Sequence, residues 1–266
     1  SGSLGEEMLK REQIRMTIES HLDKELILNP QGIKVLSLFF IDKVANYRMY
    51  DEEGNTIAGR YAKMFEEEYM KIIKRHRYQT LFNDLRDKNI DVSKVHNGYF
   101  AIDKKSKSSN KREKYDSFVD TSGNTLRDDD AFNLIMADKE RLLSFDTPLR
   151  FIFSHSALRE GWDNPNVFQI CTLNDTSTEI KKRQEIGRGL RLCVNQDGER
   201  VKGFDVNTLT VMANESYESF AKALQKEIEE DTGITFGLLH KYSFARIVVD
   251  VVNEEPVYLD EVQSEN

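Results

Sequence analysis

The stretch Ile33-Lys-Val-Leu-Ser-Leu-Phe-Phe-Ile41 decides the fold, because it is an almost continuous apolar run that follows turn-forming residues. Asn29-Pro30 and Gly32 precede it, and a residue before proline avoids the helical region of backbone space. The run is short and rich in β-branched and aromatic residues, which favours a strand over a helix. A strand without alternating polar residues is buried on both faces, as in a parallel sheet.

Further apolar runs alternate with helical patterns along the 266-residue chain. Shorter β-type runs predict strands at residues 95–102, 150–153, 167–171, 207–213 and 244–252. Apolar residues that recur every three or four positions predict helices at residues 4–29, 61–73, 129–143, 178–187 and 214–233. Residues 103–124 are polar and rich in Ser and Lys, so we expect a loop there. Alternating strands and helices indicate an α/β fold with a mainly parallel sheet.

Composition narrows the class of protein. The 39% of hydrophobic residues is too high for a disordered tail. No run approaches the roughly 18 apolar residues of a spanning helix, and no export leader is visible, so we expect no membrane partner. Ser1-Gly2-Ser3 resembles an expression scar. Cys171 and Cys193 form no disulfide framework, which suits a reducing cytoplasm.

The net charge of the chain and the spacing of its histidines limit the nucleic acids and metal ions that it could bind. The net charge of −8 argues against a basic protein that coats nucleic acid. It leaves open a DNA motor, because a motor can contact phosphates through a narrow local track of donors. The five histidines show no ligand-like spacing, so we expect no metal site.

The loop after the predicted strand at 150–153 is Ser154-His-Ser-Ala-Leu-Arg-Glu-Gly-Trp-Asp-Asn-Pro165. Parallel α/β sheets bind ligands beyond the carboxyl ends of their strands. Glycine lets a backbone approach a ligand closely, and Asp163 can accept hydrogen bonds from a ribose or hold an arginine. An Asn-Pro turn capped by Asp163 explains the same residues equally well without a ligand.

A second chemical segment is Gln184-Glu-Ile-Gly-Arg-Gly-Leu-Arg191. Arg188 and Arg191 are three residues apart, so on a helical turn both would point the same way. Paired guanidiniums suit phosphate oxygens, because each planar fork donates two hydrogen bonds at once. A solvated basic helix end is the alternative. Gly187 and Gly189 argue against it, because glycine costs about 1 kcal/mol inside a helix.

The chain lacks two features of a complete nucleotide site. It contains no G-x-x-x-x-G-K-[ST] phosphate loop, and no acidic magnesium-binding box follows an apolar strand. The chain therefore contains arginines that could bind a nucleotide, but it has no loop that would bind the phosphates. Either another domain supplies that phosphate-binding loop, or the protein does not use ATP.

These residues resemble a known family. Glu160-Gly-Trp-Asp163, followed by the segment 184–191, resembles motifs V and VI of superfamily 2 helicases. The fuller stretch 151–171 resembles the restriction (Res) subunit of Type III restriction enzymes. Residues 35–48 lie where that family has motif IV, and residues 211–220 resemble its continuation. The likeness extends from about Gly32 to Gly233 and is weakest in the predicted loop at 103–124.

The resemblance implies a second RecA-like helicase lobe at residues 4–233. Residues 234–266 would be a β-rich extension or a linker towards a nuclease domain outside this chain. ATP with Mg²⁺ would bind mainly to the first RecA-like lobe of the same subunit. The other implied partners are double-stranded DNA and the modification (methyltransferase) subunit.

The resemblance also implies roles for individual residues. Arg188 and Arg191 would contact the γ-phosphate of ATP, one of them as arginine finger, and Gln184 would bond near that phosphate or its water. Trp162 departs from the small aliphatic residue that other helicases often have there. The remaining site residues would be Gly161, Asp163 and Gly187 on the nucleotide side, and Ser154, His155 and Ser156 on the DNA side.

Two other interpretations stay open. The chain resembles lobes of other superfamily 2 DNA translocases in motif VI, and an interaction module that kept the fold without ATP would show the same pattern of strands. Because the chain has neither a phosphate loop nor a P-D…[DE]-x-K nuclease pattern, we expect it to hydrolyse no ATP and cleave no DNA by itself.

Overall fold

The computed structural model describes most of the chain. The described residues are 2–51, 56–82, 91–100, 134–135, 138–155, 162, 164–174, 179–213, 215–232, 248–252 and 255–258. The chain divides into two compact units, residues 1–217 and residues 218–266. The predicted loop at 103–124, Asn214 and Gly233 lie outside the described residues.

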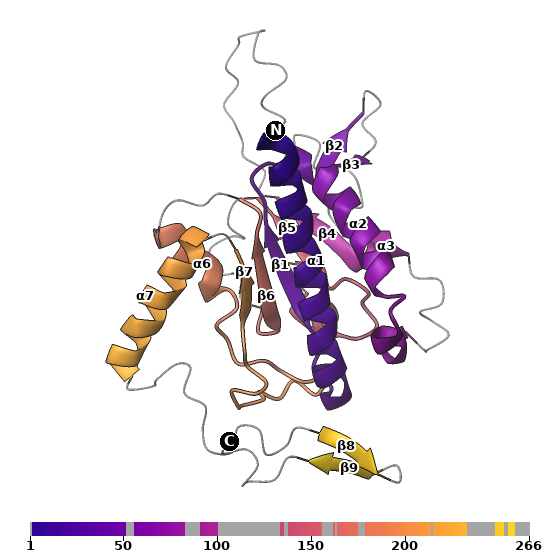
Figure 1. Cartoon of the computed structure of the whole chain (residues 1–266), viewed down its shortest axis with the longest axis vertical. Coiled ribbons are helices and arrows are strands. Elements are labelled where there is room, and N and C mark those ends of the chain that lie inside the picture. The colour runs from indigo at the N-terminus through magenta and orange to yellow at the C-terminus, as the bar shows by residue number, and fades with distance from the viewer. Residues whose placement is uncertain are drawn as a thin grey trace. The chain divides into compact units, whose positions relative to one another are not determined.

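Five strands form one sheet in the first unit, in the order β4-β5-β1-β6-β7 (Figure 1). Every neighbouring pair is parallel. The central strand is β1, which comes from the apolar run at 33–41 and is buried at all five positions. The strands are β1 (Leu36–Phe40), β4 (His96–Tyr99), β5 (Phe151–Ser154), β6 (Val167–Thr172) and β7 (Thr210–Met212). This is the predicted α/β arrangement of RecA-like type.

The first unit also contains α-helices. They are α1 (Gly2–Leu28), α2 (Arg60–Ile72), α3 (Val92–Val95), α5 (Lys139–Leu143) and α6 (Glu179–Gly187). Short 3₁₀ segments lie at Asn29–Gln31, Val44–Asn46 and His76–Phe82. The predicted helices at 4–29, 61–73 and 178–187 are confirmed to within two residues. The antiparallel hairpin of β2 (Arg48–Tyr50) and β3 (Thr56–Ala58) was not predicted.

The second unit contains most of α7 (Glu215–Thr232) and an antiparallel hairpin. The hairpin pairs β8 (Val248–Val252) with β9 (Glu255–Tyr258). β8 confirms the strand predicted at residues 244–252 over the part of that range that the structure describes. Within the described ranges, no helix has the length and apolar content needed to cross a membrane.

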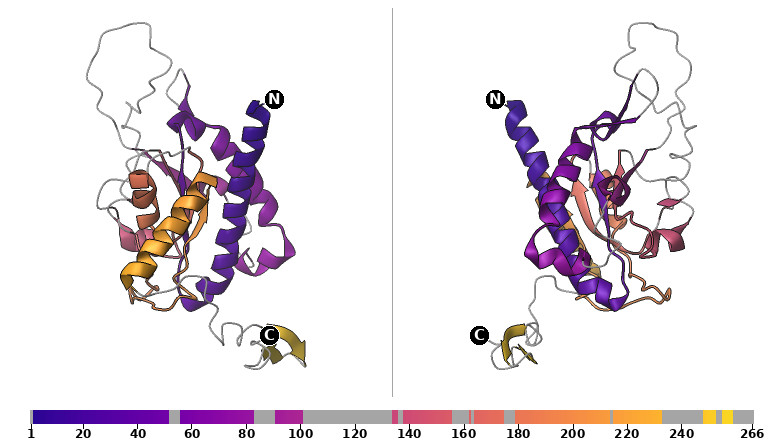
Figure 2. Two further views of the ribbon diagram at one scale, coloured as in Figure 1. Left: turned by 60° about the vertical axis from the view of Figure 1, so that its left-hand side comes forward. Right: turned by 90° about the vertical axis from the view of Figure 1, so that its right-hand side faces the viewer.

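The two faces of the sheet carry two separate hydrophobic clusters. Figure 2 shows α1 and α2 on the same side of the sheet, and side chains from that side form the first cluster with Phe39, Phe153 and Cys171. The rings of Phe39 and Phe153 stack with centroids 4.5 Å apart. Alternate strand residues, Leu38 and Ile152 among them, point to the opposite face and form the second cluster. Cys171 is fully buried, which confirms the prediction of a small buried apolar group, and this burial raises the pKa of its thiol to about 12.

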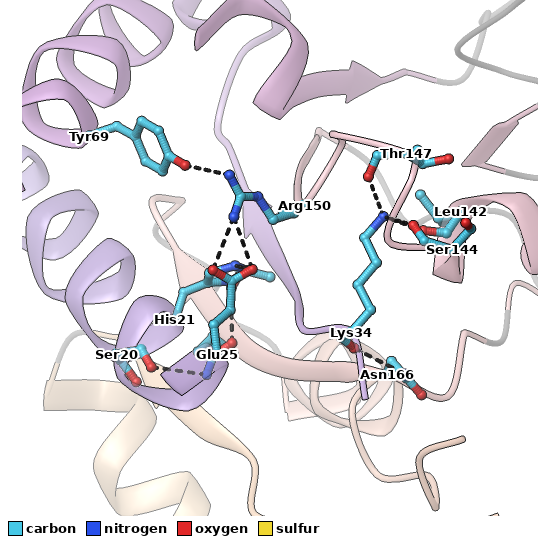
Figure 3. A network of polar contacts seen from close by, with 12 residues as sticks. Ser20, His21, Glu25, Lys34, Tyr69, Leu142, Ser144, Thr147, Arg150 and Asn166 are labelled. Atoms are coloured by element: carbon cyan, nitrogen blue, oxygen red, sulfur yellow. Dashed lines mark hydrogen bonds and ion pairs between the residues drawn. The ribbon is translucent and has the colours of Figure 1, made fainter. Parts of the chain in front are cut away.

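A buried ion pair joins α1 to the start of β5 (Figure 3). Nη1 of Arg150 donates to both carboxylate oxygens of Glu25, at 3.0 and 3.2 Å, and Nη2 donates to the hydroxyl of Tyr69 on α2 at 2.6 Å. The ring of His21 lies 3.1 Å from the same carboxylate and 2.7 Å from the Ser37 hydroxyl of β1. Burial alone would raise the pKa of Glu25, but Arg150 and His21 lower it to about 2.

A buried lysine organises the same end of the sheet. Lys34, just before β1, is 2% exposed, and its ammonium donates to the carbonyls of Leu142, Ser144 and Thr147 at 2.6–2.9 Å. The Leu142 carbonyl belongs to the last turn of α5, where helix carbonyls lack partners and attract a cation. Burial, with a smaller effect of Arg150, lowers the pKa of Lys34 to about 7. The lysine therefore fixes the connection between α5 and β5.

The Glu25 carboxylate should make the fold sensitive to acid. Because its pKa is lowered from 4.5 to about 2, its stabilising effect is complete above pH 4.5 and is lost as the pH falls towards 2. The difference corresponds to about 3 kcal/mol in the free energy of unfolding. We expect urea unfolding, followed by circular dichroism, to show this loss in the wild type and not in Glu25→Gln.

At pH 7, Glu25→Gln should lower the free energy of unfolding by about 3–5 kcal/mol, because it leaves the charge of Arg150 buried without its carboxylate. The matched control is Glu12→Gln on the same helix, whose carboxylate bonds to Arg15 at the surface. We expect little change there. The same acid dependence in the wild type and in Glu25→Gln would contradict this assignment.

Candidate functional site

The loop that carries the first chemical segment begins at the carboxyl end of β5. Ser154 is the last residue of that strand and is fully buried, and its carbonyl accepts a hydrogen bond from the Ile41 amide at 2.8 Å. A contact between DNA and the Ser154 side chain would therefore require movement of the loop. His155 follows and is partly exposed. The predicted site residues Ser156, Gly161 and Asp163 lie outside the described residues.

Trp162 anchors this loop to the second hydrophobic cluster. Its side chain is only 2% exposed, and its indole N–H donates to the carbonyl of Ile135 at 2.8 Å. A buried indole N–H without an acceptor would cost about 1–3 kcal/mol, so this bond fixes the orientation of the ring. The tryptophan that departs from the helicase pattern thus has a structural role in this chain.

The second chemical segment folds back onto the first. α6 ends at Gly187, and the chain then turns, with the Arg188 amide 3.2 Å from the Glu185 carbonyl and the Gly189 amide 2.9 Å from that of Ile186. Nη1 of Arg188 donates to the main-chain carbonyl of Trp162 at 2.8 Å. One hydrogen bond therefore joins the loop after β5 to the turn after α6.

The two arginines do not share a helical face, which corrects one step of the sequence argument. Because α6 ends at Gly187, Arg188 lies in the turn and Arg191 lies beyond it. Arg188 is partly buried against Trp162, whereas the side chains of Arg191 and Gln184 are exposed. The three residues remain close in the sequence, but turn geometry, rather than helical spacing, sets the directions of the arginines.

The inward face of α6 carries polar residues that the sequence argument did not single out. Lys182 and Glu185 are each about 95% buried, and the Asn174 amide donates to the Glu185 carboxylate at 3.4 Å. Asn174 lies just after the carboxyl end of β6. The contact orients α6 with Glu185 inward, which leaves its neighbour Gln184 exposed.

Asn166 is a second residue that the sequence argument missed. Its amide nitrogen donates to the carbonyls of Lys34 and Val194, both at 2.9 Å, and its oxygen accepts from the Val194 amide at 2.9 Å. Asn166 therefore ties the end of the loop to the start of β1 and to the chain that follows Arg191. From the sequence, Asn-Pro-Asn indicated only a turn. The role of Asn166 was not visible, because its partners Lys34 and Val194 lie far from it along the chain.

The two glycines beside Arg188 differ in their surroundings. A β-carbon on Gly189 would lie 2.4 Å from the Cδ1 atom of Leu209, which packs against the second hydrophobic cluster. At Gly187, apart from the adjacent residues and the backbone of its own helix, no atom lies within 4 Å of the position that a β-carbon would take. A side chain at position 189 would therefore have to displace the side chain of Leu209, whereas Gly187 leaves open space beside Arg188.

Comparison of the sequence with curated proteins shows which of them the chain resembles. No protein-family model matches the chain. The chain is 41% identical over 203 residues to the Res subunit of the Type III restriction-modification enzyme EcoPI of Escherichia phage P1, and 40% identical over 203 residues to that of EcoP15I of Escherichia coli. It is 34% identical over 223 residues to the StyLTI Res subunit of Salmonella typhimurium.

The chain is similar to a region of the Type III Res subunits. The three matches cover 74–77% of this chain and 19–20% of each relative, so the chain spans about a fifth of their length. The resemblance to Type III Res subunits that the sequence motifs indicated is thus confirmed for the region that the matches cover, which we call the Res-subunit region. The roles predicted for its individual residues stay predictions.

The two glycines of the Res-subunit region allow a paired test. Gly189→Ala should lower the free energy of unfolding by about 1–3 kcal/mol, because the added methyl group collides with Leu209. Gly187→Ala should keep or slightly raise it, because the space is open and alanine favours a helix. Urea unfolding of both variants measures the difference. An equal loss of stability in the two would contradict the assignment.

Proposed function

We propose that this chain is the second RecA-like lobe of the ATP-driven motor in a Type III restriction enzyme. Three observations support the proposal: the similarity to three Res subunits, the five-stranded parallel sheet, and the turn that brings Arg188 to the loop after β5. The hydrogen bond from Arg188 to the Trp162 carbonyl carries most of the argument, because it assembles the two helicase-like segments at one place.

The donors in this region fit the phosphates of ATP. Arg188 and Arg191 supply guanidiniums, which bind phosphate oxygens in pairs. Gly187 leaves room for a close approach beside Arg188. The sequence has no phosphate loop, so the first lobe of the same subunit would hold most of the ATP and its Mg²⁺. ATP supplies the hydrolysable γ-phosphoryl bond when it is bound.

In this proposal the chain's own residues stabilise charge and orient groups. Arg188 and Arg191 neutralise the negative charge that develops on the phosphate, one of them as arginine finger, and Gln184 orients the phosphate or its attacking water. An arginine finger contributes about 10³–10⁵ in rate. It acts only when the two lobes close, so the chain alone would hydrolyse no ATP.

The other partners follow from the same proposal. The names of the relatives mark them as Res subunits of restriction-modification enzymes. By analogy, a modification subunit would associate with the complete protein, and a nuclease domain elsewhere in the subunit would cut double-stranded DNA. Gly161 and Asp163 would lie on the nucleotide side of the loop after β5. His155 and Ser156, with Ser154, would lie on the side that faces the DNA backbone.

Replacement of Arg188 tests the proposal. In the complete Res subunit with its modification partner, Arg188→Ala should lower the kcat of DNA-stimulated ATP hydrolysis by at least about a hundredfold, because a finger contributes 10³ or more. Circular dichroism of the variant checks that it remains folded. Arg200→Ala is the matched control, since it removes an exposed arginine that has no role in the proposed site.

An ATPase rate that stays unchanged in Arg188→Ala would contradict the motor proposal. It would favour an interaction module that kept the RecA-like fold. A comparable loss in Arg200→Ala would also count against the proposal, because the effect would then follow from the loss of any positive charge.

A further inference from the structure

We infer that Trp162 is a positioning residue that sets the place of Arg188 for ATP hydrolysis. The inference rests on the proposed function and adds a residue to it. Trp162 does not reach the nucleotide in this assignment. It acts through its main-chain carbonyl, which accepts the hydrogen bond from Nη1 of Arg188 at 2.8 Å.

The side chain of Trp162 determines where that carbonyl lies. The indole is buried in the second hydrophobic cluster, and its N–H donates to the Ile135 carbonyl at 2.8 Å. Packing fixes the ring, and the hydrogen bond fixes its rotation about the side-chain axis. The carbonyl is attached to the α-carbon that carries this ring, so the acceptor for Arg188 is held between two anchored points.

A fixed acceptor matters because an arginine side chain has many rotamers. A guanidinium that must find its place during each catalytic cycle loses conformational entropy, whereas one that is already oriented loses little. A hydrogen bond from a charged donor to a carbonyl is also stronger than a neutral one. The contact therefore orders Arg188 before the lobes close.

The turn itself has a second support. Gly189, next to Arg188, packs so closely against Leu209 that a β-carbon would displace the Leu209 side chain, and Leu209 contacts the same hydrophobic cluster as Trp162. The backbone of Arg188 and the tip of its side chain are thus both positioned by contacts to the second hydrophobic cluster, the first through Gly189 and Leu209 and the second through Trp162. A change in the packing of Trp162 is transmitted to the arginine through these two routes.

The functional test is a double-mutant cycle in the complete Res subunit with its modification partner. Trp162→Phe keeps an aromatic ring but removes the N–H that reaches Ile135. We expect it to lower kcat for ATP hydrolysis roughly 10- to 100-fold, with little change in the KM for ATP. In an Arg188→Ala background, Trp162→Phe should have almost no further effect.

The cycle separates this inference from the proposed function. Equal losses from Trp162→Phe in both backgrounds would overturn the positioning role, because a purely structural residue acts independently of Arg188. An unchanged rate in Arg188→Ala alone would instead overturn the proposed function. A rise in KM with kcat unchanged in Trp162→Phe would also overturn the positioning role.

A second measurement does not depend on the folding of a tryptophan variant. Trp162 is the only tryptophan of the 266-residue chain, so its fluorescence reports on this loop alone. We expect Arg188→Ala to increase the quenching of Trp162 by acrylamide, because the loop loses its bond to the turn. Arg200→Ala is the control and should leave quenching unchanged. Quenching that is unaffected by Arg188→Ala would overturn the contact on which the inference depends.

Discussion

The buried pair of Glu25 and Arg150 is the interaction on which the rest of the structure depends. It removes two charges from water, which is costly unless the pair is well aligned. Here one guanidinium nitrogen bridges both carboxylate oxygens and the other reaches Tyr69. Because Arg150 immediately precedes β5, the pair fixes that strand against α1 and α2, and with it the start of the loop that leads to Trp162.

From this end of the sheet, a chain of polar contacts reaches the candidate site. Lys34 holds the connection before β5 through three carbonyls, and its own carbonyl accepts from Asn166. Asn166 in turn holds Val194, which follows the arginine-containing turn. The loop after β5 and the turn after α6 are therefore fixed at their far ends by Asn166 and at their centres by the bond between Arg188 and Trp162.

Much of this fold was predictable from the sequence, because burial on both faces leaves a clear apolar signal. The run at 33–41 predicted β1, and the runs at 150–153 and 167–171 predicted β5 and β6. The β2–β3 hairpin escaped prediction because its strands have three residues each and are largely exposed. The segment at 184–191 was found from its spacing, but the end of α6 at Gly187 changed how its arginines are arranged.

The contacts that build the site were not predictable, because they join residues that are distant in the sequence. Glu25 and Arg150 are 125 positions apart, and Lys34 lies 108 positions from Leu142. A charged residue in isolation indicates a solvated surface, and only the folded chain shows that these are buried. Trp162 likewise differed from the helicase pattern without a visible reason until its bonds to Ile135 and Arg188 were known.

The most direct test is a structure of the complete Res subunit with its modification subunit, a non-hydrolysable ATP analogue and Mg²⁺. We predict that a guanidinium nitrogen of Arg188 or Arg191 lies within hydrogen-bond distance, about 2.7–3.2 Å, of a γ-phosphate oxygen. A closed nucleotide complex in which both arginines point away from the phosphates would contradict it.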